Sequence, residues 1–250
     1  MNEPQNKFYT SIARYYSQIF PFNPQQLHFV EKQIAGLSGK EILDIGCATG
    51  ELAFQLVENQ ANVTGIDLNK DLLQQAINKQ GNASYPRFML KNMLHLEKDF
   101  EARQFDTVLC FGNTLVHLED KDNIVQMLKG VHKVLKPNGK FLFQILYYDY
   151  IVDEQIAELP LIETPEIRFS RRYRFNDNSP IISFYTELYL KKENRTLINE
   201  TPLLALRSAQ LSELLERTGF QKIEFYAGFN QAAFGGKHIP LVGAAHTEPV

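Results

Sequence analysis

The chain has 250 residues, 26 basic and 29 acidic side chains, and a hydrophobic content of 44%. This length suits one domain, and the near-neutral charge gives no sign of a nucleic-acid or anionic-membrane partner. No apolar run approaches the roughly 18 residues that span a bilayer, so we expect no membrane span. The first residues lack a secretion signal, and the only cysteines are Cys47 and Cys110. We therefore expect no disulfide and a cytoplasmic location.

The first notable segment of the chain comprises residues 8–16. It carries three tyrosines, of which Tyr9 and Tyr15 are expected to pack on the edge of a sheet.

Residues 41–51 hold the most informative pattern of the chain. A short apolar strand that includes Asp44 is followed by a turn through Gly46, Ala48 and Gly50 and then by a helix. Small residues in such a turn let a ligand approach the backbone closely. About twenty residues further on, a second predicted strand ends at Asp67, as in a nucleoside-binding α/β unit in which an acid accepts the ribose hydroxyls.

One feature of this turn argues against a dinucleotide. The dinucleotide fingerprint requires glycines at positions 46, 48 and 51, whereas this chain has Ala48 and Glu51. A carboxylate placed where a phosphate would lie disfavours a pyrophosphate ligand.

The alternation of helix and strand signals continues to about residue 147. A helix begins after a cap at Asn69, and further elements are predicted as strands at 87–90, 105–111 and 140–146, with a helix around 124–131 that stops at 136–139. Such a rhythm predicts a parallel sheet with right-handed crossovers.

The rhythm then breaks. Residues 167–176, 181–191 and 195–206 read as three strands with no helix between them, so we expect a small antiparallel β insert after strand five, in a lobe at about 150–206 of a single domain 1–250. A helix at 208–218, capped by Ser208 and stopped by Gly219, and strands at 221–226 and 239–245 complete the chain. The insert lies on the side where ligands of open α/β sheets bind, which favours a lid or substrate wall.

The pattern Asp44-x-Gly46-x-Ala48-x-Gly50 resembles motif I of class I S-adenosylmethionine-dependent methyltransferases, and the likeness extends over about residues 8–245. The resemblance implies an α/β, Rossmann-like, mostly parallel sheet of seven strands in the order 3-2-1-4-5-7-6, with strand 7 antiparallel. It also implies S-adenosyl-L-methionine as the cofactor.

The resemblance further implies a set of cofactor-binding residues. Asp67 would bind the ribose, Leu68 the adenine, Asp44 the methionine amino group and Tyr16 the methionine end. Asn92 stands where the family usually has Asp, and it is equally readable as a turn residue at a strand end. The full implied set is Tyr16, Asp44, Gly46, Cys47, Ala48, Gly50, Asp67, Leu68, Asn92, Met93, Phe111 and Gly112.

The segment Cys110–Leu118 resembles the Gly-Asn-Ser/Thr-x-x-x-His stretch of glycine and other small-molecule N-methyltransferases. This implies that Asn113 and His117 face the substrate, and it makes His117 and Tyr16 candidates for catalysis. The alternative is that His117 is a histidine of the core. Arg171 falls on the apolar face of its predicted strand, where it would bind an acidic substrate group, pair with Glu187 or discourage edge pairing.

We therefore expect a methyltransferase acting on a small-molecule substrate, with an amine favoured over a hydroxyl or a carbon. The alternative is a non-catalytic S-adenosylmethionine-binding sensor or partner subunit, and Ala48 with Glu51 disfavours a nicotinamide-dependent oxidoreductase. No spacing of metal ligands is present, and the sequence leaves the oligomeric state open.

Overall fold

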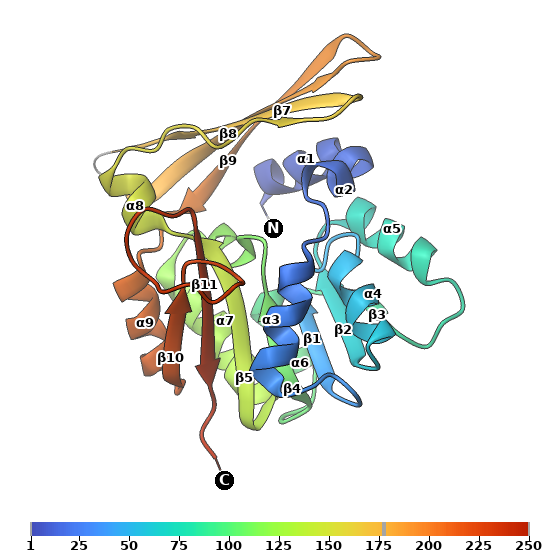
Figure 1. Ribbon diagram of the computed structural model, residues 1–250, viewed down its shortest axis with the longest axis vertical. Helices are drawn as coiled ribbons and strands as arrows, with labels where there is room; N and C mark the ends of the chain where they lie inside the picture. Colours follow the sequence, from blue (N-terminus) through green and yellow to red (C-terminus); the bar gives the residue numbers. More distant parts are fainter. Residues whose placement is uncertain (1, 177–178, 250) are drawn as a thin grey trace.

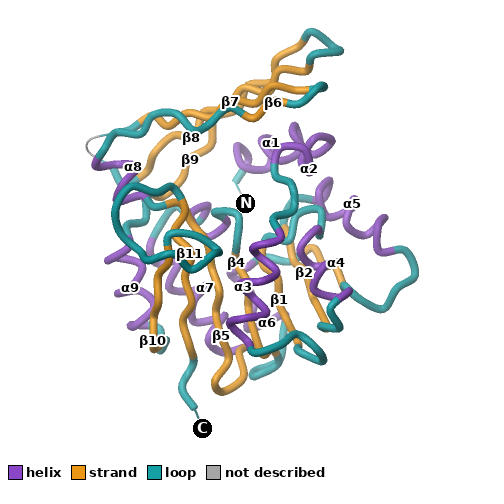
Figure 2. The backbone as a smooth tube through the Cα atoms, viewed as in Figure 1, coloured by secondary structure: helices purple, strands orange, loops and turns teal. Residues whose placement is uncertain are grey.

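Two β-sheets organise the computed structural model, which describes residues 2–176 and 179–249 (Figures 1 and 2). Residues 1, 177, 178 and 250 of the predicted domain lie outside the described part. The larger sheet has the order β10-β11-β5-β4-β1-β2-β3 and the smaller one the order β6-β7-β8-β9. Their strands are β1 (Glu41–Ile45), β2 (Asn62–Asp67), β3 (Arg87–Leu90), β4 (Phe105–Cys110), β5 (Leu135–Leu146), β6 (Ile162–Glu163), β7 (Ile167–Arg174), β8 (Ile181–Leu190), β9 (Arg195–Leu204), β10 (Gln221–Tyr226) and β11 (Pro240–His246).

The helical elements alternate with the strands of the larger sheet. They are α1 (Glu3–Ile12), η1 (Ala13–Tyr15), α2 (Tyr16–Ile19), α3 (Pro24–Ile34), α4 (Glu51–Glu58), α5 (Lys70–Gln80), η2 (Met93–His95), α6 (Leu96–Asp99), η3 (Thr114–His117), α7 (Lys121–Val134), α8 (Tyr148–Asp153) and α9 (Ser208–Arg217).

The predicted topology of the larger sheet is confirmed. Strands β1 to β5 pair in parallel, and β11 runs antiparallel to both β5 and β10. With β10 and β11 counted as the sixth and seventh strands, the order is 3-2-1-4-5-7-6. The carboxyl ends of the parallel strands therefore meet at one edge, where such folds bind ligands.

Helices cover both faces of this sheet. Side chains alternate between the two faces along each strand, so each strand contributes to the packing on both sides. In β5, Phe141 and Phe143 belong to a buried cluster with the apolar residues of α7 and α9, whereas Leu142 belongs to a second cluster with those of α3 and α4. Strands buried on both faces read as nearly continuous apolar runs, which is why they were recognisable in the sequence.

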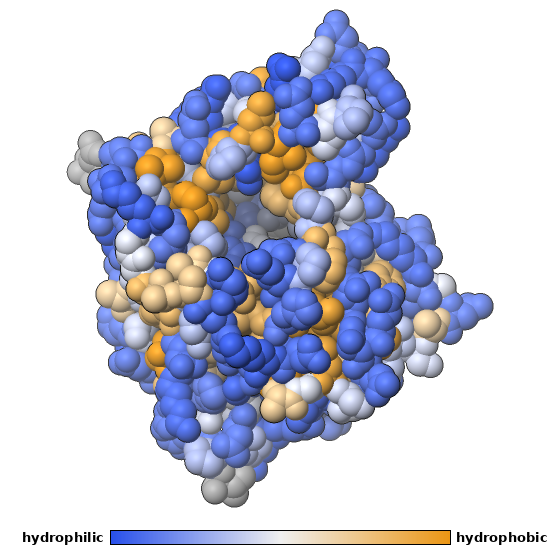
Figure 3. Space-filling view, viewed as in Figure 1, coloured by the Kyte–Doolittle hydropathy of each residue, from blue (hydrophilic) through white to orange (hydrophobic). Residues whose placement is uncertain are grey.

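The smaller sheet lies beyond the carboxyl ends of the parallel strands, with α1 and α2 against it (Figure 1). We call residues 162–204 the antiparallel lobe and residues 3–19 the N-terminal cap. Phe8, Ile12 and Ile19 of the cap are buried in one cluster with Phe169 and Leu188 of the lobe. The cap and lobe thus share a hydrophobic core, and the surface is hollowed between the lobe and the body of the molecule (Figure 3).

Three local predictions need correction. The insert holds four strands and the helix α8, because the two-residue β6 adds to the edge of β7. Strand β5 already begins at Leu135, and its register with β4 shifts where the chain bulges before Lys140. Ser208 is not the cap of α9: the N-cap is Arg207, without a side-chain hydrogen bond, and the backbone N–H of Ser208 donates to Asp149 at 2.8 Å.

Candidate active site

A cavity of about 720 Å³ lies at the carboxyl edge of the larger sheet, under the N-terminal cap. Its walls come from the cap and from the loops that follow β1, β2, β3 and β4. It is lined by most of the predicted site residues, namely Tyr16, Asp44, Gly46, Cys47, Ala48, Asp67, Leu68, Asn92, Met93, Phe111, Gly112 and His117.

The loop after β1 is fixed by its own backbone. The N–H groups of Gly46 and Cys47 donate to the carbonyl of Ile66 at 2.8 and 3.1 Å, and the N–H of Ala48 donates to Asp67 Oδ2 at 2.9 Å. Gly46 has φ +75, and a Cβ there would lie 2.6 Å from the Thr114 hydroxyl. Because these three donors already have partners, none of them is free to bind a phosphate oxygen.

Two carboxylates face the cavity: Asp44 is buried and Asp67 is half-buried. Burial and the neighbouring Asp67 raise the pKa of Asp44 to about 7, and burial also raises the pKa of Asp67. No basic side chain of the described residues contributes to either value. An unpaired buried carboxylate is costly, so this end of the cavity favours a ligand that brings positive charge or hydrogen-bond donors and disfavours an anionic one.

Asp67 is held rigidly for such a role. Its Oδ1 accepts from the N–H of Asn69 at 2.7 Å, and its Oδ2 accepts from Ala48. Each carboxylate oxygen can accept a second donor, so two positions remain for ligand hydroxyls. Asn69 itself caps α5 through its side chain, as predicted, by accepting from the N–H of Leu72.

The apolar end of the cavity is formed after β2 and β3. Leu68 and Met93 line it, together with Asn92. The Asn92 side-chain oxygen accepts from the N–H of Leu94 at 3.0 Å, which is the turn role that the sequence left open. A flat apolar ring is the kind of group that such walls accommodate.

His117 lies on the cavity wall, at the end of η3, and not within the core. Its Nε2 is 2.8 Å from the hydroxyl of Tyr9, and its Nδ1 is buried without a hydrogen-bond partner among the described residues. Burial lowers the pKa of His117 to about 4, so the imidazole is neutral at physiological pH. The Gln5 side chain donates to the His117 carbonyl at 2.8 Å and fixes the cap against this residue.

Three predicted site residues do not line the cavity. Gly50, with φ +78, forms the start of α4, where a Cβ would meet the ring of Phe88. Both the nitrogen and the oxygen of the Asn113 side-chain amide are hydrogen-bonded within the protein. The nitrogen donates to the Tyr148 hydroxyl at 2.9 Å, and the oxygen accepts from the N–H of Leu146 at 3.0 Å.

Arg171 is the third. It lies in the antiparallel lobe and donates to the carbonyl of Pro160 at 2.8 Å. The alternative pairing with Glu187 is wrong, because Arg171 stands opposite Thr186 in the register of β7 and β8. Glu187 stands opposite Ser170, on the other face of the sheet.

Tyr9 was expected at a sheet edge and instead lines the cavity, as a site residue that was not predicted from the sequence. A signal was present: Gln5, Tyr9 and Tyr16 are spaced by four and seven residues and so share one helical face. All three line the cavity, whereas Tyr15 is buried against the lobe.

Within the described ranges, no three His, Cys, Asp or Glu side chains gather as the ligands of a metal ion would, and no helix combines the length and apolarity needed to cross a membrane. Both cysteines are free and buried.

Comparison with known proteins places this geometry in context. Residues 37–172, more than half of the chain, match a family model described as a methyltransferase domain. A ubiquinone biosynthesis O-methyltransferase of Idiomarina loihiensis is 33% identical over 135 residues, which cover 52% of this chain and 52% of that protein. The chain spans about half the length of the curated relatives it matches.

Solved structures resemble the whole chain. A S-adenosylmethionine-dependent methyltransferase from Clostridium acetobutylicum superposes with a TM-score of 0.80 at 18% identity, over 96% of this chain and 99% of that one. The CcbJ methyltransferase from Streptomyces caelestis gives a TM-score of 0.78 at 18% identity, over 96% of both chains. At these identities the likeness concerns the fold.

Proposed function

This chain belongs to the family of methyltransferase domains, and from that membership we propose that it transfers a methyl group from S-adenosylmethionine to a small-molecule acceptor. The proposal takes the whole chain as one methyltransferase domain with the antiparallel lobe inserted in it. A cytoplasmic location belongs to the proposal too, and the two free cysteines support it.

The observation that carries the proposal is the pair of carboxylates on the cavity wall, buried Asp44 and half-buried Asp67, neither of which has a basic partner among the described residues. S-adenosylmethionine brings a sulfonium, an ammonium and ribose hydroxyls, all of which suit Asp44 and Asp67. A dinucleotide would bring two negative charges to the same place, where the N–H groups of Gly46, Cys47 and Ala48 are already occupied. In this proposal Asp67 accepts the ribose hydroxyls and Asp44 faces the methionine amino group.

The remaining walls suit the other parts of this cofactor. Leu68 and Met93 would pack on the adenine, with Asn92 at its edge. Gly112, where an added Cβ would meet nothing within 4 Å, leaves room beside Phe111 for the methionine chain. The electron-rich ring of Tyr16 would face the sulfonium, an attraction of roughly 0.5–2 kcal/mol. The cofactor supplies an activated methyl group, and the protein supplies orientation.

We propose an amine as the acceptor. Tyr9 lies beside Tyr16 on the cavity wall and contacts His117, and both Tyr9 and His117 are uncharged at physiological pH, so neither offers a cation to an anionic nucleophile. A hydroxyl acceptor is the alternative, since the Idiomarina loihiensis relative is named as an O-methyltransferase.

Two measurements test the proposal. Calorimetry should show that S-adenosylhomocysteine binds and that NADH does not. A screen of amines, phenols and carbon acids with isotope-labelled methyl donor, read by mass spectrometry, should then reveal a methylated product. Binding of S-adenosylhomocysteine with no product from any acceptor would favour the sensor or partner subunit, and heat from NADH alone would overturn the proposal.

A further inference from the structure

The contact between Tyr9 and His117 joins the N-terminal cap to the loop after β4 across the cavity. The hydroxyl oxygen and Nε2 are 2.8 Å apart, and the two rings meet edge-on with centroids 5.5 Å apart. Both residues line the cavity, and the ring centroid of Tyr9 is 6.5 Å from that of Tyr16. Tyr9 therefore presents its hydroxyl beside the place proposed for the reacting methyl group.

The Tyr9 hydroxyl oxygen keeps at least one free lone pair, whether the proton in its hydrogen bond with His117 comes from Tyr9 or from His117. A neutral imidazole carries one ring proton, so Nε2 either accepts from the Tyr9 hydroxyl or donates to it. In the first case the Tyr9 oxygen has two lone pairs to spare, and in the second case one. The oxygen can thus accept a hydrogen bond from a ligand in the cavity while His117 holds it in place.

Neither residue suits the role of a general base. The pKa of His117 is held at about 4 by burial, and the pKa of Tyr9 is raised by burial and by its neighbours Asp67 and Tyr148. Tyr16 also stays protonated, because burial raises its pKa well above the ordinary value. Asp44 and Asp67 face the proposed cofactor. The other carboxylates of the cavity lining are engaged elsewhere: Glu51 pairs with Lys79, Glu119 accepts from the Asn2 side chain, and Asp120 caps α7. The acceptor must consequently arrive as a nucleophile that needs no deprotonation, and a neutral amine meets this requirement.

We infer that the Tyr9 oxygen, positioned by His117, accepts a hydrogen bond from an N–H of the acceptor amine, so that primary and secondary amines are methylated and tertiary amines are not. This inference rests on the proposed function. The nitrogen lone pair forms the N–C bond while the electrons of the S–C bond pass to sulfur, and the N-methylammonium product gives its proton to water. Positive charge develops on nitrogen during this step, so the N–H becomes a stronger donor and the contact with Tyr9 tightens in the transition state.

The test uses three forms of whichever amine the screen shows to be converted fastest: the primary amine, its N-methyl form and its N,N-dimethyl form. The wild-type enzyme should methylate the first two and give no quaternary product. Tyr9→Phe should lower kcat/KM for both by about 10- to 100-fold, mainly through kcat, with unchanged affinity for S-adenosylhomocysteine. Tyr15→Phe is the matched control, because Tyr15 belongs to the cap but lies outside the cavity, and its activity should equal that of the wild type.

The role of His117 has a separate readout. His117→Gln keeps a side-chain hydrogen-bond partner for Tyr9 and should retain most of the activity that His117→Leu loses. The pH dependence of kcat/KM should follow the pKa of each acceptor amine, in the wild type and in both variants. A break at one fixed pH for all amines, absent from His117→Leu, would make His117 a base and overturn the inference.

Other outcomes are equally decisive. A quaternary product formed as fast as the tertiary one, an unimpaired Tyr9→Phe, or methylation of phenols alone would overturn the inference and leave the methyltransferase standing. Absence of any methylated product with any acceptor would instead count against the proposed function.

Discussion

At the scale of single residues, Asp44 links stability to ligand binding. Its carboxyl is 5% exposed and has no basic partner among the described residues. In the unfolded chain it titrates near 3.8, and in the folded protein near 7. Between these values the folded state holds a proton that the unfolded state has released, so stability falls as pH rises from about 4 to 7. The ionised Asp44 carboxylate destabilises the ligand-free protein, and the same negative charge is what a cationic ligand would need for binding.

Asp44→Asn should therefore stabilise the ligand-free protein while it weakens cofactor binding. At pH 8 we expect a gain of about 1–3 kcal/mol in the free energy of unfolding, because the variant buries no charge there. At pH 5 the gain should be smaller, because Asp44 is still largely protonated in the folded wild-type protein there. Denaturant unfolding at both pH values measures the first effect, and calorimetry with S-adenosylmethionine measures the second, expected as a loss of tenfold or more. An identical pH dependence in both proteins would refute this account of Asp44.

Asp67 should matter for affinity through its two free acceptor positions. Asp67→Asn keeps the shape of the side chain but replaces one acceptor oxygen by a donor, which opposes the N–H of Ala48 or of Asn69 and removes an acceptor for a ribose hydroxyl. We expect the affinity for S-adenosylhomocysteine to fall about 10- to 100-fold in calorimetry. Asp106→Asn is the control, since Asp106 pairs with Lys136 and lies outside the cavity lining. Equal losses of affinity in the two variants would contradict the assignment of Asp67 to the ribose.

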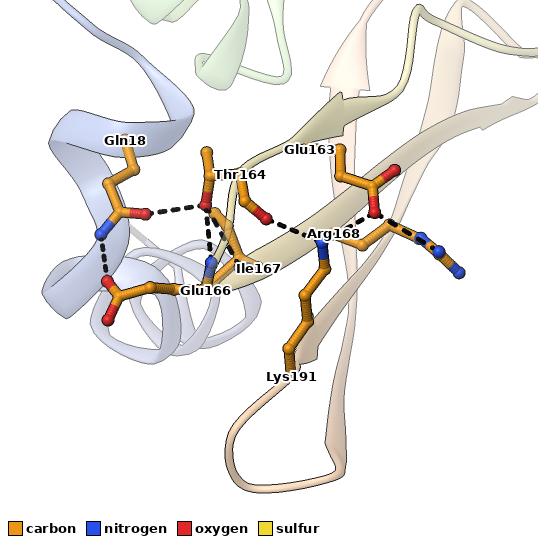
Figure 4. Close-up of polar contacts among 7 residues, drawn as sticks. All are labelled: Gln18, Glu163, Thr164, Glu166, Ile167, Arg168 and Lys191. Atoms are coloured by element: carbon orange, nitrogen blue, oxygen red, sulfur yellow. Dashed lines mark hydrogen bonds and ion pairs between the residues drawn. The ribbon is translucent and has the colours of Figure 1, made fainter.

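At the scale of secondary-structure elements, α2 is fixed to the antiparallel lobe by the amide of Gln18 (Figure 4). Its Nε2 donates to Glu166 at 2.8 Å, and its Oε1 accepts from the Thr164 hydroxyl at 3.0 Å. The Thr164 oxygen also accepts from the N–H groups of Glu166 and Ile167, each at 3.2 Å. Lys191 adds contacts to the same turn, at 2.8 Å from the Thr164 carbonyl. The lobe thus holds the helix that carries Tyr16 over the cavity.

Gln18→Ala should loosen this attachment without touching the cavity. Gln18 does not line the cavity, but Tyr16 and Phe20, two residues on either side, do. Loss of two hydrogen bonds should cost about 1–2 kcal/mol of stability and raise the dissociation rate of S-adenosylhomocysteine several-fold. Stopped-flow displacement measures that rate. Gln74→Ala is the control, because it removes only an exposed contact with Asn78 in α5, and it should leave the dissociation rate unchanged. If Gln18→Ala also releases the ligand at the wild-type rate, the lobe does not support the cap.

Local signals in the sequence were enough for most elements of the body. The strand Arg87–Leu90 and the cap at Asn69 were predicted as they are found, because a short apolar strand and a capped amphipathic helix are each recognisable from a few consecutive residues. The two-residue β6 is too short to leave such a signal. The N-terminus of α9 escaped prediction because its donor finds Asp149, 59 residues away, and not a local side chain.

The candidate site was predictable where a motif fixes both the backbone and the side chain. The loop that holds Gly46 and the acid Asp67 are such cases. Asn113 was misplaced because its positive φ of 65° turns the amide inward, toward Tyr148. Tyr9 was missed because its partner His117 is 108 residues away, so only the fold brings the two together.

At the scale of the whole molecule, the cap touches its two neighbours in different ways. Toward the lobe it buries a continuous set of apolar side chains, including Phe8, Ile12 and Ile19. Toward the body it makes scattered polar contacts, such as the Thr10 hydroxyl to Asp71 at 2.6 Å, together with a small apolar cluster around Ala48 and Leu72. Polar groups recover hydrogen bonds to water when they separate, whereas apolar surface does not. The contact between the cap and the body of the molecule is therefore weaker than the contact between the cap and the lobe.

This difference predicts that the cap and lobe open and close over the cavity as one unit when the cofactor enters. Hydrogen exchange read by mass spectrometry, with and without S-adenosylhomocysteine, should show slower exchange in residues 3–19 and in residues 162–204 together, because closure suppresses the same opening in both. The strand β5 and helix α7, buried in the body, should change little and serve as internal controls. In Gln18→Ala the ligand should still protect the loop after β1 but protect the lobe less. Protection confined to residues 46–50 would show that neither the cap nor the lobe closes on the ligand. Protection of the cap without the lobe would contradict movement as one unit, which we expect because the shared apolar core cannot separate without exposing Phe8 and Phe169 to water.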